Sequence, residues 1–165
     1  TFMSEGPSGD EIRISVGGDQ MVDIIEDGDN GNHVTFLTSS AGFTQKAVVY
    51  DDSYSRAEFH KFGNKQFLTF EDASEEIDLR LYFPPVSCNC VLVIKQHASG
   101  GDSVATDGWL AFDYEGNAAS GSSIVLWPGG TEPTLTTAAN AVDIFSFYWD
   151  ATNEIAYGVA SLDFK

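Results

Sequence analysis

The stretch that decides the fold reads Val142-Asp143-Ile144-Phe145-Ser146-Phe147-Tyr148-Trp149. In an extended chain, successive side chains point to opposite sides of the sheet, so alternate residues of this stretch share a face. One face carries Val142, Ile144 and Tyr148, and the other carries Phe145, Phe147 and Trp149. A strand that is apolar on both faces is either central in a two-layered sandwich or covered on its outer side by another subunit.

The rest of the chain repeats the strand pattern in short runs separated by turns. Ile12, Ile14 and Val16 alternate with polar residues and end at a Gly-Gly pair. Further β-rich runs occupy residues 21–25, 34–37, 47–50, 66–70, 79–83, 91–95, 109–112, 124–127 and 155–164, and a helical turn is expected only near residues 73–76. The sequence predicts an all-β fold, an antiparallel β-sandwich or jelly roll of about ten strands.

Charge limits the partners of the chain. Its 165 residues include 8 Lys and Arg against 25 Asp and Glu, a formal net charge of −17. Nucleic acids and anionic membrane surfaces are bound by clustered basic residues, so neither is an expected partner. No apolar run approaches the roughly 18 to 20 residues of a spanning helix, so we expect a soluble chain without membrane insertion. The chain begins Thr1-Phe2-Met3 without signal-peptide features, and we expect a processed product or a piece of a longer chain.

Two compositional features predict domains and an oligomer. Residues 1–45 are rich in Gly, Asp, Ser and Asn and have short strands, as in a shaft-like or connecting β region. Residues 46–165 carry most of the aromatics and form the expected C-terminal β-sandwich domain, with the boundary between Ser39 and Gln45. The 12 Phe, 6 Tyr and 3 Trp are more rings than we expect one small core to bury, which favours an oligomer.

No catalytic, cofactor or metal motif is recognisable in the sequence. The chain lacks the spaced-His zinc pattern, the Gly-x-Ser-x-Gly elbow and the glycine-rich nucleotide loops, so we expect no enzyme and no cofactor. The acidic stretch 26–32 fails as an EF-hand, because position twelve would be Leu37; a hairpin turn is favoured over a looser Ca²⁺ site. The carboxylates of residues 71–78 are interpreted as a solvated loop, and Cys88 and Cys90 as reduced, packed thiols.

Aromatic side chains near polar loops are the candidate ligand contacts. Trp109, Tyr114, Trp127 and Trp149 are the rings that could stack on a sugar, although a core or subunit-interface position is the competing interpretation for each. The best of them are Trp109 and Tyr114, which flank a segment rich in Gly, Ser and Asp. Asp102, Asp107 and Asn117 are the accompanying candidates for hydrogen bonds to sugar hydroxyls.

A structural role is expected for a second group of residues. Gly129 and Gly130, after a proline, break one strand sharply. Asp143 shares a face with Phe145 and Phe147, a costly place for a carboxylate unless donors bind it. We therefore predict that Asp143 holds the segment 134–137, which contains Thr136, through hydrogen bonds.

The C-terminal part of the chain resembles a known family. The motifs are Trp-Pro-Gly-Gly-Thr at 127–131, Thr-Leu-Thr-Thr at 134–137 and Val-Asp-Ile at 142–144, preceded by the runs 79–84 and 91–96. In this order they resemble the C-terminal domain of tailed-bacteriophage fibre and related virion structural proteins, over about residues 60–165. The resemblance implies a homotrimeric β-sandwich on the particle surface, without catalysis.

Three functions follow as hypotheses. The first is a trimeric tail or neck fibre, or spike tip, whose partners are copies of itself, other virion proteins and, as candidate receptor, a host-surface glycan. The second is a capsid decoration or cement protein that stabilises the head. The third is an unrelated carbohydrate-binding module or glycosidase fragment.

Overall fold

The computed structural model describes residues 2–5, 11–16, 19–25, 33–36, 46–48, 54–118 and 125–164. The chain divides into two compact units, Thr1–Gly42 and Phe43–Lys165. The division falls between Ser39 and Gln45, where the composition changes. The acidic stretch 26–32 lies outside the described residues.

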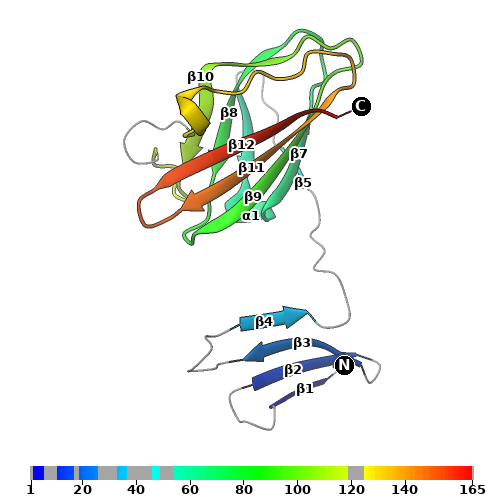
Figure 1. Ribbon diagram of the computed structural model, residues 1–165, viewed down its shortest axis with the longest axis vertical. Coiled ribbons are helices and arrows are strands. Elements are labelled where there is room, and N and C mark those ends of the chain that lie inside the picture. Colours follow the sequence, from blue (N-terminus) through cyan, green and yellow to red (C-terminus); the bar gives the residue numbers. More distant parts are fainter. Residues whose placement is uncertain are drawn as a thin grey trace. The chain divides into compact units, whose positions relative to one another are not determined.

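The N-terminal unit contains one antiparallel sheet. Its strands β1 (Phe2–Glu5), β2 (Glu11–Val16), β3 (Asp19–Ile25) and β4 (His33–Phe36) pair in chain order (Figure 1). Neighbours in this order are joined by short connections, which is the simplest way to build an antiparallel meander. The alternation around Ile12 and Ile14 predicts β2, whereas β1 was not predicted.

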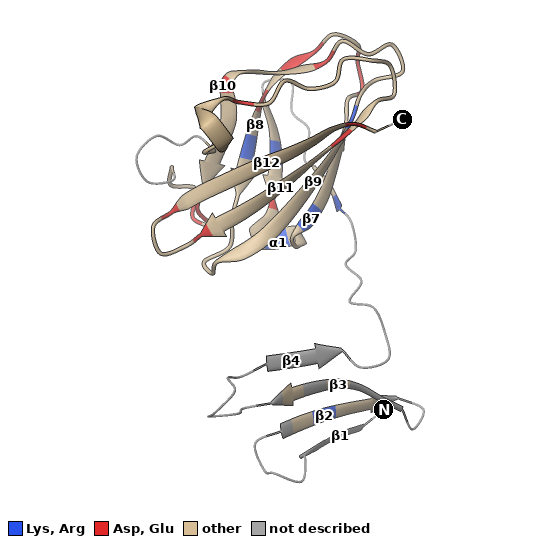
Figure 2. Ribbon diagram, viewed as in Figure 1, with Lys and Arg blue, Asp and Glu red and all other residues tan. Residues whose placement is uncertain are grey.

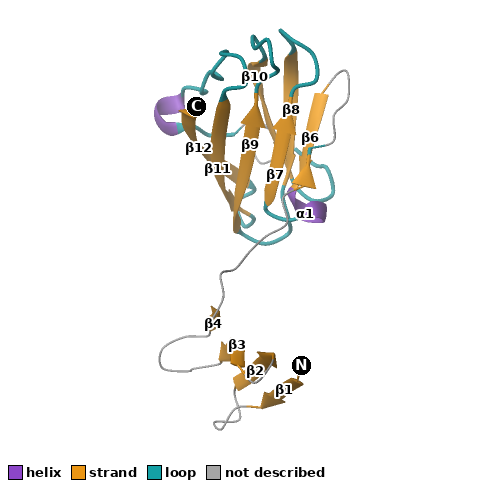
Figure 3. Cartoon of the chain, turned by 90° about the vertical axis from the view of Figure 1, so that its right-hand side faces the viewer, coloured by secondary structure: helices purple, strands orange, loops and turns teal. Residues whose placement is uncertain are grey.

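The C-terminal unit contains two sheets that pack face to face (Figures 1 and 3). One sheet has the order β10-β8-β6 and the other the order β12-β11-β9-β7-β5. The elements are β5 (Lys46–Ala47), β6 (Tyr54–Glu58), α1 (Phe59–Phe62), β7 (Lys65–Thr69), β8 (Glu76–Tyr82), β9 (Cys88–Lys95), β10 (Ser103–Phe112), the 3₁₀ turn η1 (Pro128–Gly130), β11 (Val142–Asp150) and β12 (Ile155–Phe164).

The chain is all-β as predicted, but its pairing differs from an antiparallel sandwich or jelly roll. From β5 to β11, each strand lies in the opposite sheet from the strand before it. Strands two apart in the sequence therefore become neighbours and run the same way, so β6, β8 and β10 are parallel, as are β5, β7 and β9. The β9–β11 and β11–β12 pairs are antiparallel, which makes the larger sheet mixed.

Three local predictions were wrong. Strand β6 was missed, although Tyr54, Arg56 and Glu58 alternate there with smaller residues. The helical turn lies at α1, directly after β6, while residues 73–76 form a turn that leads into β8. The strand expected at 124–127 is represented among the described residues by a single bridge, from Leu126 to Tyr157 of β12.

The core of the C-terminal unit is a layer of aromatic rings between the two sheets. Trp109 of β10 packs on Phe145 of β11 with ring centroids 4.6 Å apart. Phe83, just after β8, stacks on Trp149 at 4.8 Å. Trp149 also donates its indole N–H to the carbonyl of Pro84 at 2.8 Å, so its one polar atom is satisfied inside the core. Through these contacts the opposite sheet packs on the inner face of β11.

A buried carboxylate fixes the loop that precedes β11. Asp143 is 2% exposed, and its Oδ2 accepts a hydrogen bond from the backbone N–H of Thr136 at 2.7 Å. Its Oδ1 accepts a second from the backbone N–H of Asp163, near the end of β12, at 2.9 Å. The Thr136 contact is the one expected from the sequence, and the Asp163 contact extends it across to β12. One side chain thus joins the 131–141 loop to both C-terminal strands.

Replacing Asp143 by alanine leaves both backbone donors without their acceptor. We expect Asp143→Ala to lower the free energy of unfolding by about 2 to 4 kcal/mol, since a hydrogen bond to a charged group contributes on the order of 1.5 to 3 kcal/mol. Urea unfolding followed by circular dichroism measures the change. The control is Asp72→Ala, which removes an exposed carboxylate from the turn before β8 and is expected to have little effect. A wild-type midpoint for Asp143→Ala would contradict the clamp.

Candidate functional site

Two of the five predicted glycan contacts lie in the interior. Trp109 is 1% exposed within the aromatic layer. Asp102 is fully buried, and its carboxylate accepts hydrogen bonds from the backbone N–H groups of Glu75 and His97 at 3.1 and 2.9 Å. The prediction that these side chains contact a ligand is wrong, because Trp109 fills the core and Asp102 ties two loops together. Trp127 and Trp149 are buried as well.

The other three candidates lie at the surface, but not in one site. Tyr114 and Asn117 belong to the turn after β10, where Asn117 donates its side-chain amide to Asp113 at 2.9 Å. Tyr114 lines a hollow with Tyr82 and other residues. Asp107 lines a different hollow and donates its backbone N–H to Glu132 at 3.1 Å. The predicted glycan site is therefore not a single constellation.

The predicted strand break is a tight turn that positions Trp127. Gly129 and Gly130 have φ of 71° and 72°, left-handed values that favour glycine, and the N–H of Gly130 donates to the carbonyl of Trp127 at 2.9 Å. The Trp127 ring then lies directly over Gly158 of β12, where an added Cβ would come within 2.5 Å of the ring. The Trp127 indole thus packs directly against the backbone of Gly158, in space that a side chain would occupy.

The outer side of the five-stranded sheet exposes several large apolar side chains, and we call it the apolar face. Its side chains stand in rows set by the strand register. The rows are Tyr157, Tyr148 and Asn89; Val159, Ser146, Val91 and Lys65; Ser161, Ile144, Val93 and Phe67; and Phe164, Val142, Lys95 and Thr69. The sequence predicts this face in part, since it identifies Val142, Ile144 and Tyr148 as a second apolar side of one strand.

Several large apolar side chains of this face are open to solvent. Val159 is 55% exposed, Tyr148 48%, Phe164 47% and Tyr157 43%. Tyr148 and Tyr157 stack with ring centroids 6.4 Å apart. Together with Val91 and Val159 they line a groove of about 710 Å³ that runs beside Leu126. A contiguous apolar surface of this kind marks an interaction site on a soluble protein.

The electrostatics of the apolar face differ from those of the chain as a whole. None of the residues in these four rows is an Asp or a Glu, although the chain has 25 of them, and the acid of β11 on this side is Asp150 at the strand end, paired with Ile155. The charges within the rows are the ammonium groups of Lys65 and Lys95. Figure 2 shows the acidic residues of β11 and β12 at the strand ends, with uncharged residues between them. The repulsion that a net charge of −17 creates between copies is therefore weakest here.

The two cysteines lie behind this face, on the inner side of β9. Their Sγ atoms are 3.5 Å apart and both are free thiols, with Cys90 fully buried. Burial, and then the neighbouring Cys88, raises the pKa of the Cys90 thiol well above its ordinary value. Cys90 therefore stays a packed thiol at neutral pH, since the thiolate is the reactive form.

Among the described residues, no group of three or more His, Cys, Asp or Glu side chains is arranged to hold a metal ion. No helix in the described part of the chain is long and apolar enough to cross a membrane.

Similarity to known proteins does not assign a function to these features. No protein-family model, curated protein or solved structure matches the chain. The resemblance to phage fibre domains is therefore a hypothesis that rests on sequence motifs alone.

Adding one methyl group at Gly158 tests whether the Trp127 ring packs against this glycine. We expect Gly158→Ala to lower the free energy of unfolding by about 1 to 3 kcal/mol, because overpacking a filled site forces neighbours to shift. Thermal unfolding measures the loss, and the near-ultraviolet circular dichroism of the indole rings is expected to change with it. Ser161→Ala, on the outer side of the same strand, is the control. A wild-type spectrum and midpoint for Gly158→Ala would show that the ring is not held there.

Proposed function

We propose that this chain is a non-catalytic structural subunit of a bacteriophage particle, and that it assembles as a homotrimer through the apolar face. The position that agrees best with its motifs is a tail or neck fibre, or a spike tip, at the particle surface. The observation that carries the self-assembly is the absence of carboxylates from the exposed apolar rows of β12, β11, β9 and β7.

Charge supports a second copy of this chain as the occupant of the apolar face. Two copies that each carry −17 repel one another over most of their surfaces. An approach through the apolar face keeps the carboxylates apart and removes exposed side chains such as Val159 and Tyr148 from water. Self-association thus gains hydrophobic free energy where the electrostatic cost is smallest.

The structural role, rather than catalysis, is supported by the use of the buried acids. Asp102 and Asp143, the two aspartates that are buried among the described residues, both accept hydrogen bonds from backbone N–H groups. Their carboxylates hold loops in place instead of facing an open cleft. Rigid loops on a sandwich suit a subunit that has to keep its shape on a particle.

The trimer and the phage particle are supported by the motif order in residues 127–144 alone. The same motifs suit a capsid decoration protein, which is the second candidate. Both candidates require self-association or contact with other virion proteins, and they differ in location.

Mass in solution tests the assembly. At micromolar concentration, light scattering is expected to give three times the mass of one chain for the wild type. Val159→Glu places a carboxylate in the middle of the apolar face and is expected to give the monomer. Val86→Glu is the matched control, because Val86 is 63% exposed in the loop between β8 and β9 and does not belong to the rows of the apolar face, and it should leave the trimer intact. A monomeric wild type, or a folded Val159→Glu of wild-type mass, would overturn the proposal.

Location on the particle tests the rest. Gold-labelled antibodies against the chain are expected to decorate the tail or neck of purified phage particles in electron micrographs. Decoration at the three-fold positions of the capsid would instead support the cement protein. Particles that carry no label would contradict both the fibre and the cement-protein assignments.

A further inference from the structure

The outer face of the three-stranded sheet holds two arginines side by side. Arg56 of β6 and Arg80 of β8 are paired in register on adjacent parallel strands, so their side chains leave the sheet on the same side. Both guanidinium groups approach one ring, that of Tyr54: the central carbon of Arg80 lies 3.8 Å from the ring centroid and that of Arg56 lies 5.6 Å from it. Two of the eight basic residues of the chain thus meet at one point.

This pair is incompletely satisfied by the protein. The Nε atoms of Arg56 and Arg80 are both buried from solvent, and neither has a hydrogen-bond partner among the described residues. Like charges directly opposite one another on neighbouring strands are unfavourable. The Tyr54 ring compensates in part, since a cation over an aromatic face is attracted to it. A bound anion would supply a hydrogen-bond acceptor for the two guanidinium groups and a negative charge to balance them.

A hollow lies beside Arg56, one member of the arginine pair. It has a volume of about 200 Å³, and Arg56, His60, Tyr82 and Tyr114 are among its lining residues. Tyr82 is backed by Phe112, with which it stacks at 5.1 Å, while the Nδ1 atom of His60 is buried and has no partner in the described part of the chain. The hollow therefore combines two tyrosine rings with the basic side chains of Arg56 and Lys61, and its lining also includes the carboxylates of Glu58 and Glu115.

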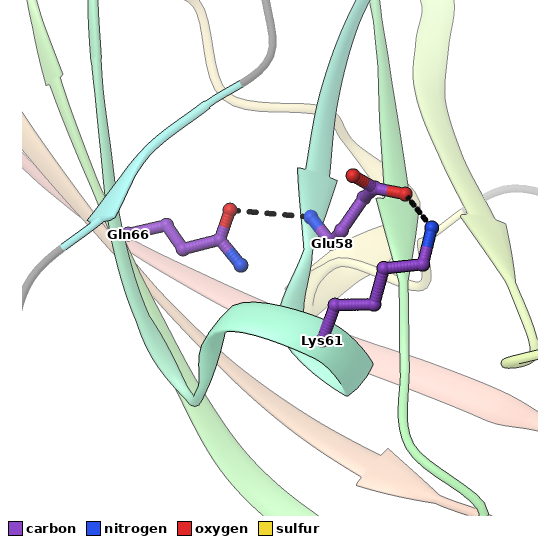
Figure 4. A network of polar contacts seen from close by, with 3 residues as sticks. All are labelled: Glu58, Lys61 and Gln66. Atoms are coloured by element: carbon purple, nitrogen blue, oxygen red, sulfur yellow. Dashed lines mark hydrogen bonds and ion pairs between the residues drawn. The ribbon is translucent and has the colours of Figure 1, made fainter.

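The acid nearest to the arginine pair along β6 is already engaged. Glu58 also lines the hollow, but its carboxylate accepts from the ammonium of Lys61 at 2.6 Å. Its backbone N–H donates to the side-chain oxygen of the buried Gln66 at 3.1 Å, which holds the strand end in place (Figure 4). Figure 4 shows the Glu58 carboxylate directed at Lys61. Glu58 is thus held by its own lysine. Asp78 of β8 lies on the same side of the sheet, opposite Tyr54 in register, but among the described residues no ion pair joins it to Arg56 or Arg80.

We infer that this face of β6 and β8 binds an acidic sugar. The forked guanidinium groups of Arg56 and Arg80 bind the carboxylate, because that geometry matches two parallel N–H···O bonds. The sugar ring occupies the adjoining hollow against Tyr82 and Tyr114, since the apolar side of a sugar packs on aromatic rings. The inference goes beyond the proposed function and names a ligand class, a carboxylate-bearing saccharide.

Nuclear magnetic resonance of the full chain tests the site directly. The Nε–H signals of Arg56 and Arg80 are expected to shift on titration with galacturonate and to stay in place with galactose, its neutral counterpart. Acetate is the third probe, because it carries the carboxylate without the ring; we expect it to bind more weakly than galacturonate. Equal affinities for acetate and galacturonate would overturn the saccharide assignment, and unshifted arginine signals would overturn the site.

Matched variants separate the site from general electrostatics. Arg56→Gln and Arg80→Gln are each expected to weaken galacturonate binding at least about tenfold, the loss of one hydrogen-bonded charge pair. Lys46→Gln, which removes a positive charge from the exposed strand β5 of the other sheet, is expected to bind as the wild type does. Thermal unfolding confirms that each variant is folded. Equal weakening by all three variants would overturn the inference.

The outcome is independent of self-assembly. The mass of the unliganded protein tests the apolar face, on the opposite sheet, whereas the titration tests the arginine face. A trimer that fails to bind galacturonate would refute the sugar site alone. A monomer that binds it would refute the trimer alone.

Discussion

The aromatic layer between the two sheets is the constraint on which the C-terminal unit depends. Trp109 lies against Phe145, and Phe83 lies against Trp149, so each sheet supplies half of a single packed interior. Strands that alternate between the sheets, from β5 to β11, wind the chain around this layer. This alternation explains the parallel pairs. It also requires each connection between consecutive strands to pass from one sheet to the other. The buried carboxylates of Asp102 and Asp143 then fix the connections at one end.

Because one layer of rings uses the inner side of both sheets, the two outer sides are left for different purposes. The outer side of β12, β11, β9 and β7 is largely apolar, with the carboxylate of Asp150 at the end of β11, whereas that of β6 and β8 carries a pair of arginines over a tyrosine. In a chain of net charge −17, both surfaces depart from the average. One suits contact with copies of the chain, and the other suits a ligand that brings its own negative charge.

The sequence predicted what depends on local pattern and missed what depends on pairing. The two apolar sides of residues 142–149 identified β11 and its open face, and the lone acid among aromatics identified Asp143 as a hydrogen-bond acceptor. Whether a tryptophan beside a glycine-rich loop is buried is decided by the opposite sheet, so Trp109 was misjudged. The arginine pair could not be predicted from the sequence. Residues 56 and 80 meet only because β6 and β8 are paired, while β7, which lies between them in the sequence, belongs to the other sheet.

Strand β11 has a further consequence, for the order of events during folding. Its inner side completes the aromatic layer through Phe145, Phe147 and Trp149, and its outer side supplies the centre of the apolar face. The apolar face therefore cannot form before β11 pairs with β9, and the same pairing completes the aromatic core. Under the proposed assembly, association through the apolar face therefore has to follow the docking of β11.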